Sequence, residues 1–317
     1  MQVNPMRYIL AMTGLLALMP LHSQASPANA STNSPPWPFP GAINLDKAFC
    51  AEGPIIVQLR LDDGEGLPFM VDTGALVTFL DASLTPKLGR RLGSGHIPFP
   101  FESGVGAQGI YQMPKLCAGE MPLAMGPRVY TVKLRTSPAR PYKGILGMDC
   151  MWHYCIQFDF AAGKMVFLDP DHVETLDLGT PFTIAPKPEG TTFFDADLFG
   201  QGKMHFLLDT GFSGPFDAML TPKVFEKLSR ENRTIGPDLY MQLADGRAAS
   251  GSIFPTLNIS GQSYTDLWIS EVDMPKRYEG IIGMRFLARH KITLNFPKRT
   301  FYLKATSSAP LPKPGSG

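Results

Sequence analysis

The 317-residue sequence has little charge, and none of it is concentrated in one segment. Charged residues make up 18% of the chain, the formal net charge is +1, and basic runs such as Arg90-Arg91 stop after two residues. Proteins that bind nucleic acids through surface charge carry a basic patch or stripe, which is lacking here. The sequence therefore predicts no nucleic-acid partner.

Several catalytic and metal-binding motifs are also missing. The chain contains no His-Glu-x-x-His zinc motif, no serine or cysteine nucleophile motif, and no full calcium loop at its acidic turns. Residues 150–155 have the spacing Cys-x-x-His-x-Cys, which alone is a weak indication of zinc. Alternation along the chain predicts that His205 is a strand-surface or packing residue. We therefore expect no metal and no cofactor.

The N-terminus has the features of an export signal. Arg7 precedes an apolar core of about 14 residues, from Tyr8 to Leu21, and small residues near Ala25 offer a cleavage position. A helix that spans a membrane needs roughly 20 apolar residues. Residues 1–25 are therefore predicted to be a cleaved signal peptide. The mature protein is expected to be periplasmic or secreted, with no stable membrane insertion.

The cysteine count is low and even. The four cysteines are Cys50, Cys117, Cys150 and Cys155, all in the first half. An even number in an exported chain predicts two disulfide bonds, for which three pairings are open.

Glycine and proline are plentiful by contrast, with 31 and 30 residues respectively. They are spread between short apolar runs, a pattern typical of many short strands joined by turns. We therefore expect an all-β protein with short helices, one of them over residues 85–92. A Ser- and Pro-rich stretch after the signal predicts a flexible spacer over residues 26–45.

The strongest pattern is an internal repeat. Three blocks recur at a spacing of 136 or 137 residues. They are 69–74 (FMVDTG) with 206–211 (FLLDTG), 81–87 (DASLTPK) with 217–223 (DAMLTPK), and 144–148 (GILGM) with 280–284 (GIIGM). Two long copies predict two lobes, over residues 46–170 and 180–305, followed by a flexible tail at 306–317. An approximate twofold axis would bring the two Asp-Thr-Gly turns face to face.

Two facing carboxylates have a distinctive chemistry. A carboxylate that directly follows an apolar strand is costly to bury unpaired, and two of them cannot both ionise easily. They share one proton, so one is an acid and the other a base at the same place. This is what hydrolysis of a peptide bond by an activated water requires. Asp72 and Asp209 are therefore the predicted catalytic pair. The glycines after them, Gly74 and Gly211, let backbone N–H groups approach the carboxylates closely.

The repeated Asp-Thr-Gly turns, each followed about 75 residues later by an apolar-apolar-Gly motif, resemble the pepsin and retropepsin aspartic peptidases. The resemblance covers roughly residues 51–303 and implies a single-chain, bacterial-type enzyme with two retropepsin-like β-barrel lobes. It implies an aspartic endopeptidase that acts on a peptide or protein substrate and is a monomer. By the same resemblance, Thr73 and Thr210 interlock across the lobes, and Gly147 and Gly283 pass beneath the turns.

The resemblance also implies a glycine-rich hairpin that folds over the substrate. Residues 101–113 are the candidate, with Gly104, Gly106, Gly109 and Tyr111 expected to contact it.

Two features depart from the family pattern. Phe212 stands where the family usually has a small residue, and it is expected to narrow the cleft or form part of a subsite wall. Retropepsins carry an acidic residue near this position that pairs with a later arginine, and Arg285 lacks this partner at Ser213. The alternative function is therefore a catalytically silent peptide-binding protein on the same scaffold.

Overall fold

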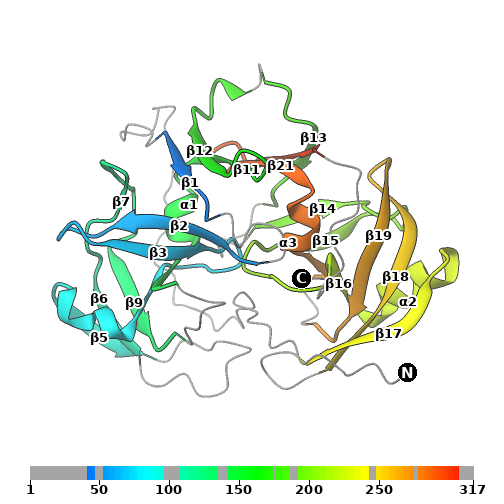
Figure 1. Cartoon of the computed structure of the whole chain (residues 1–317), viewed down its shortest axis with the longest axis horizontal. Coiled ribbons are helices and arrows are strands. Elements are labelled where there is room, and N and C mark those ends of the chain that lie inside the picture. The colour runs from blue at the N-terminus through cyan, green and yellow to red at the C-terminus, as the bar shows by residue number, and fades with distance from the viewer. Residues whose placement is uncertain are drawn as a thin grey trace.

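The computed structural model describes residues 41–46, 53–95, 108–134, 142–173, 176–185, 192–242, 248–274 and 278–306. The predicted signal peptide, most of the spacer and nearly all of the C-terminal tail lie outside these ranges. The described chain is mostly β-strand, arranged in three sheets with four short helices (Figure 1). Within these ranges, no helix is long and apolar enough to cross a membrane.

The first half of the chain forms a nine-stranded sheet. Its strands, in spatial order, are β5 (Arg91–Gly95), β6 (Gln108–Gln112), β9 (Arg128–Val132), β4 (Phe79–Asp81), β10 (Gly144–Leu146), β3 (Gly66–Val71), β2 (Ile55–Arg60), β7 (Cys117–Ala118) and β8 (Met121–Pro122).

The second half forms a seven-stranded sheet. Its order is β14 (Phe193–Ala196), β15 (Met204–Leu208), β20 (Gly280–Ile282), β16 (Ala218–Leu220), β19 (Gln262–Glu271), β18 (Ala248–Ile259) and β17 (Ile235–Gln242).

The two sheets repeat one arrangement of strands. Seven strands of the first sheet, from β5 to β2, match seven of the second, from β17 to β14. If the seven strands of each half are numbered along the chain, both sheets have the spatial order 4-5-6-3-7-2-1. In both, the strand before the Asp-Thr-Gly turn pairs in parallel with the apolar-apolar-Gly strand, with Val71 opposite Leu146 and Leu208 opposite Ile282. The repeat in the sequence therefore corresponds to a repeat in strand order.

A third sheet joins the halves. Its strands, in spatial order, are β1 (Ala42–Asn44), β12 (Lys164–Leu168), β11 (Cys155–Asp159), β21 (His290–Asn295), β22 (Thr300–Ala305) and β13 (Thr180–Thr183). The halves meet where β11 pairs with β21, with Ile156 opposite Leu294 (Figure 1). The largest cluster of buried apolar side chains also draws on both halves, including Phe69, Phe158 and Phe206.

The all-β expectation with short helices is confirmed, but the expected closed barrels are not found in the described residues. Each sheet is open, because its two outermost strands have no hydrogen-bonded neighbour on their outer side. In the first sheet the outer side of β2 pairs with β7, through Arg60 and Cys117, rather than with β5.

The helices are η1, a 3₁₀ helix (Ala82–Lys87), and the α-helices α1 (Met148–Met151), α2 (Pro222–Glu231) and α3 (Met284–Leu287). The helix expected over 85–92 therefore begins and ends earlier. The Asp81 side chain accepts the Ser83 N–H at its start, and Leu88 is extended at its end. Ala42–Asn44, in the predicted spacer, are strand β1.

The described cysteines are not cross-linked. Cys117, Cys150 and Cys155 are buried free thiols, so they form neither of the two predicted disulfide bonds. They lie in the apolar interior, where burial raises the pKa of Cys155 to about 12 and that of Cys150 well above its usual range. Cys50 lies outside the described residues.

A buried imidazole connects α3 with β19. The Tyr264 hydroxyl lies 2.7 Å from Nε2 of His290, and Nδ1 of His290 lies 3.0 Å from the Phe286 carbonyl oxygen. Because that oxygen can only accept, Nδ1 carries the proton and Nε2 accepts from Tyr264 in the neutral ring. Burial lowers the pKa of His290 to about 4.

We expect His290 to make the fold less stable as the pH falls from about 6.5 to about 4. In that window the unfolded chain binds a proton that the folded chain does not, because the folded pKa is about 4. The free energy of unfolding should fall by roughly 3 kcal/mol from this group and then level off. Urea unfolding at pH 7, 5.5 and 4 measures this fall in the free energy of unfolding. The His290→Gln variant should lack the part of the fall that comes from the imidazole.

The matched control is His172→Gln, since His172 is exposed beside Asp169. This variant should keep the parent's loss of stability below pH 6.5. An equal loss in His290→Gln and the parent would show that the buried imidazole is not its source.

Candidate active site

The two Asp-Thr-Gly turns lie directly after equivalent strands. Asp72 follows β3, and its N–H donates to the Leu146 carbonyl at 3.1 Å. Asp209 follows β15, and its N–H donates to the Ile282 carbonyl at 3.0 Å. The apolar-apolar-Gly strands of the sequence repeat therefore fix where each aspartate begins.

Each carboxylate is held by its own turn. Oδ1 of Asp72 accepts the N–H groups of Gly74 at 2.8 Å and Ala75 at 3.1 Å. Oδ1 of Asp209 accepts those of Gly211 at 2.8 Å and Phe212 at 3.0 Å. Both aspartates are fully buried. These bonds favour the charged form of each carboxyl, whereas burial and the opposite carboxylate favour the neutral form.

The structure brings the two carboxylates together. A β-carbon added to Gly74 would lie 2.9 Å from the Asp209 carboxyl, and one added to Gly211 would lie 2.5 Å from the Asp72 oxygens. Only glycine allows this approach, so each turn makes room for the aspartate of the other half. Burial, and then the negative charge of Asp72, raise the pKa of Asp209 well above its usual range.

The threonines of the two turns interlock, as the family resemblance implies. Thr73 Oγ1 donates to the Leu208 carbonyl at 2.7 Å and accepts the Thr210 N–H at 3.0 Å. Thr210 Oγ1 donates to the Val71 carbonyl at 2.8 Å and accepts the Thr73 N–H at 3.0 Å. All of these groups are buried, and each threonine hydroxyl satisfies two backbone groups.

The glycines of the two apolar-apolar-Gly motifs lie against the Asp-Thr-Gly turns. A β-carbon on Gly147 would lie 3.0 Å from the Ala75 carbonyl, and one on Gly283 would lie 2.9 Å from the Phe212 carbonyl. The residue after each glycine donates its N–H to the same carbonyl at 2.8 Å. Each apolar-apolar-Gly motif is therefore hydrogen-bonded to the Asp-Thr-Gly turn of its own half.

The predicted flap is described only in part. Gly104 and Gly106 lie outside the described residues, while Gly109 and Tyr111 lie on β6. A β-carbon on Gly109 would clash with the Tyr111 ring and would lie 3.0 Å from Thr131 Oγ1, so the ring occupies the space that glycine leaves. Tyr111 packs against the main core.

Phe212, which was expected to narrow the cleft or form part of a subsite wall, packs in the second half. Its side chain is fully buried and belongs to an apolar cluster with Phe216, Met219 and Ile281. The ring lies over Gly283, which leaves room for it. Phe212 therefore fills the interior of the second half rather than presenting a surface to a ligand.

Sequence reasoning also missed the partner of Arg285. Arg285 Nε lies 3.3 Å from Oδ2 of Asp217, and Arg289 lies 3.2 Å from Oδ1, with all three side chains buried. Burial raises the pKa of Asp217, while the two arginine charges lower it. The Asp217 carbonyl accepts the Gly283 N–H at 3.1 Å, so this charged cluster holds the glycine motif. The signal lay in the repeat, which aligned Asp217 with Asp81.

His205 lies on β15, consistent with the strand-surface or packing residue that alternation predicts. Nδ1 of His205 lies 2.5 Å from Asp195, its cross-strand partner on β14, and its ring stacks on Phe193. Among the described residues, no group of three or more potential ligands is placed to hold a metal ion.

The site is thus a fully buried pair of carboxylates that can hold one proton between them, with a symmetric network of backbone donors. A scan against protein-family models found no match, and neither did a search of curated proteins. The chemistry of the site has to be inferred from its geometry.

We expect Asp209→Asn to stabilise the fold at neutral pH. A carboxyl whose folded pKa is raised keeps a proton that the unfolded chain releases, so stability is lost as the pH rises above about 4. Asparagine cannot ionise, yet its Oδ1 can still accept the N–H groups of Gly211 and Phe212. Urea unfolding from pH 3 to 8 should show a smaller loss of stability with rising pH in the variant.

The control is Asp197→Asn, which removes an exposed carboxylate. It should follow the parent at every pH. If Asp209→Asn also follows the parent, Asp209 does not face a second carboxylate in solution.

We expect Thr73→Val to destabilise the fold by about 2–6 kcal/mol. Valine keeps the shape but removes the hydroxyl, which leaves the Leu208 carbonyl and the Thr210 N–H unpaired in the interior. Each such group costs about 1–3 kcal/mol. Thr73→Ser keeps the hydroxyl and should cost less than about 1 kcal/mol. Equal losses for both variants in urea unfolding would mean that packing of the methyl group dominates.

Proposed function

We propose that this protein is an aspartic endopeptidase, a peptide hydrolase whose catalytic residues are Asp72 and Asp209. The proposal rests above all on one observation, the reciprocal packing of each carboxylate against the glycine of the opposite turn. Thr73, Gly74, Thr210 and Gly211 are the residues that hold the pair in place.

In the mechanism, a water molecule lies between the two carboxyl groups. The pair holds one proton, because the charge of Asp72 and burial both raise the pKa of Asp209. The ionised carboxylate takes a proton from the water, whose oxygen attacks the peptide carbonyl carbon. The protonated carboxyl donates its proton to the carbonyl oxygen, giving a tetrahedral diol. Proton transfer to the leaving nitrogen then breaks the C–N bond, and neither a metal nor a covalent intermediate is required.

The finer architecture belongs to the same proposal. Two lobes, related by an approximate twofold axis through the Asp-Thr-Gly turns, hold an extended peptide in the cleft between them. The matching order of seven strands in each half supports this arrangement. Because both carboxyl groups are buried, a peptide has to open access to them when it binds. The protein is exported as a monomer and acts in the periplasm or outside the cell.

The alternative, a catalytically silent peptide-binding protein, has lost its main support. It rested on Phe212 obstructing the cleft, whereas the ring packs with Phe216 in the interior of the second half. Both carboxylates and all their N–H donors are in place. Keeping two facing acids buried is costly, and binding alone gives no reason for it.

Asp72→Asn and Asp209→Asn should each reduce peptide cleavage by about 10²–10⁴-fold, the usual contribution of acid–base catalysis. The chain from Ser26 onward would be incubated with a mixed peptide library from acidic to neutral pH. Cleavage by the parent should be greatest at acidic pH and should decline as the pair loses its shared proton.

Asp197→Asn, with its exposed carboxylate, is the matched control and should cleave like the parent. Circular dichroism at each pH establishes that every variant is folded. A cleavage maximum near neutral pH that persists in Asp72→Asn would contradict the assignment. No cleavage by the folded parent at any pH would favour the silent binding protein.

A further inference from the structure

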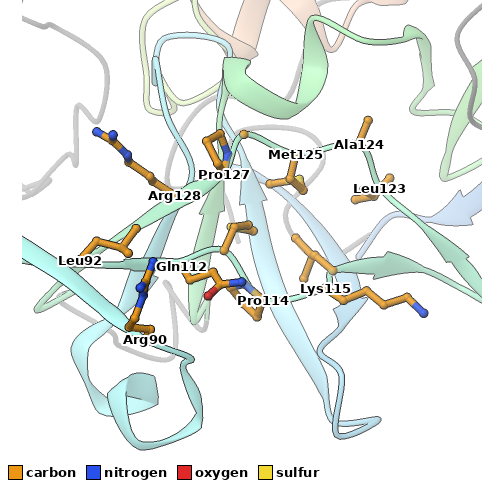
Figure 2. Close-up of a pocket in the computed structure, with 13 residues that line it drawn as sticks. Arg90, Leu92, Gln112, Pro114, Lys115, Leu123, Ala124, Met125, Pro127 and Arg128 are labelled. Atoms are coloured by element: carbon orange, nitrogen blue, oxygen red, sulfur yellow. The ribbon is translucent and has the colours of Figure 1, made fainter.

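A second candidate site lies on the first half, outside the Asp-Thr-Gly turns. It is a pocket of about 660 Å³ between the start of β5, the end of β6, the start of β9 and the segment around β7 and β8 (Figure 2). This volume is in the range of binding pockets of roughly 300–1,000 Å³. Its deepest side chains, Leu116 and Leu123, are buried, while Met113 and Met125 are half-buried.

The charged side chains that line the pocket are all cationic. Arg90, Lys115 and Arg128 are exposed at its rim, and none of its lining residues is acidic. In the described part of the chain, none of these three cations forms an ion pair. Figure 2 shows the two arginines with Leu92 at one end, Lys115 at the other, and the side chains of Pro114, Met125 and Pro127 between them. The rim is therefore cationic at both ends and apolar in the middle.

The strand register sets the spacing of the arginines. Gln112 pairs with Arg128 on β9, and its N–H donates to the Arg90 carbonyl on its other side at 2.9 Å. Adjacent strands lie about 4.8 Å apart, so the Cα atoms of Arg90 and Arg128 are roughly 10 Å apart across Gln112. Arginines whose Cα atoms have this spacing can each receive a separate carboxylate.

Backbone pairing restricts how a ligand can bind. The Met113 N–H donates to the Pro127 carbonyl at 3.1 Å, and the Leu123 N–H donates to the Leu116 carbonyl at 2.8 Å. The Lys115 N–H donates to the Asp62 side chain at 3.2 Å. These backbone donors are already used, so a peptide would be recognised through its side chains rather than by adding a strand. Methionine side chains adapt to different apolar partners.

We propose that this pocket binds a peptide segment of a partner protein that has acidic residues on both sides of an apolar centre. The arginines receive carboxylates at one end, Lys115 receives another at the opposite end, and the apolar centre lies over Met113 and Met125. The occupant is a peptide because the rim is open and its cations are too far apart for a single carboxylate. The site is independent of Asp72 and Asp209, so it does not rest on the proposed function.

The test is fluorescence anisotropy with a labelled hexapeptide of the sequence Glu-Glu-Leu-Leu-Glu-Glu. The protein carries Asp209→Asn, so that the probe is not cleaved. The probe should bind, whereas peptides with lysine in place of glutamate, or serine in place of leucine, should bind at least tenfold more weakly. Arg90→Gln combined with Arg128→Gln should weaken binding of the probe about tenfold. Added salt should weaken binding of the probe to the protein that keeps both arginines.

The matched control combines Lys223→Gln with Lys227→Gln, which removes two exposed cations from α2. It should leave probe binding unchanged. Equal weakening by both double variants, or equal binding of the glutamate and lysine peptides, would overturn the proposal. A failure of the probe to bind would also overturn it. If the peptide does not bind but dodecanoate, a fatty-acid anion with one carboxylate, binds in a way that depends on Arg90 and Arg128, the pocket is a site for a lipid-like anion instead. A parent chain that binds the probe but cleaves no peptide would count against the proposed function alone.

Discussion

The Asp-Thr-Gly turns are joined by hydrogen bonds that neither half of the chain can complete by itself. The hydroxyl of Thr73 satisfies two backbone groups of the second half, and that of Thr210 satisfies two of the first. All these groups are buried, so separating the halves would leave four backbone groups to find other partners. The same interlock brings each carboxylate over the opposite glycine. The coupling between Asp72 and Asp209 is therefore a consequence of how the two halves are held together.

The two halves support their turns with different side chains. In the first half, the Thr78 hydroxyl donates to Asp149 at 2.7 Å and accepts the Gly147 N–H at 3.2 Å. In the second half, Asp217 accepts the Gly283 N–H through its carbonyl and binds two arginines through its carboxylate. Each solution holds the glycine of the apolar-apolar-Gly motif in place. The symmetry of the turns thus does not depend on symmetry of the layer beneath them.

The sequence alone was enough to predict the all-β class, from glycine and proline spread between short apolar runs, and the pairing of Asp72 with Asp209, from the repeated Asp-Thr-Gly turns. It was not enough to predict the Asp217–Arg285 pair, whose members are 68 positions apart and depart from the pattern that the family resemblance supplied. It did not predict the apolar cluster in which the Phe212 ring packs, since a pattern of residues does not show which side chains surround a ring. The disulfide prediction used composition and compartment, neither of which places two thiols within bonding distance.

The charges of the two buried arginines of the second half act on Asp217, where they lower its pKa against the effect of burial. Asp217 and its two arginines together carry one excess positive charge in the interior, if all three are ionised. Arg289 also donates to the carbonyls of Thr265 and Asp266, and Arg285 lies 5.1 Å from the centre of the Trp268 ring. The carboxylate pair is governed by other groups. The N–H groups of Gly211 and Phe212 favour the charged form of Asp209, whereas burial and the charge of Asp72 favour its neutral form. Because Asp72 has equivalent N–H donors in its own turn, either carboxyl can be the ionised one in a pair that holds one proton, which is the state that peptide hydrolysis would require.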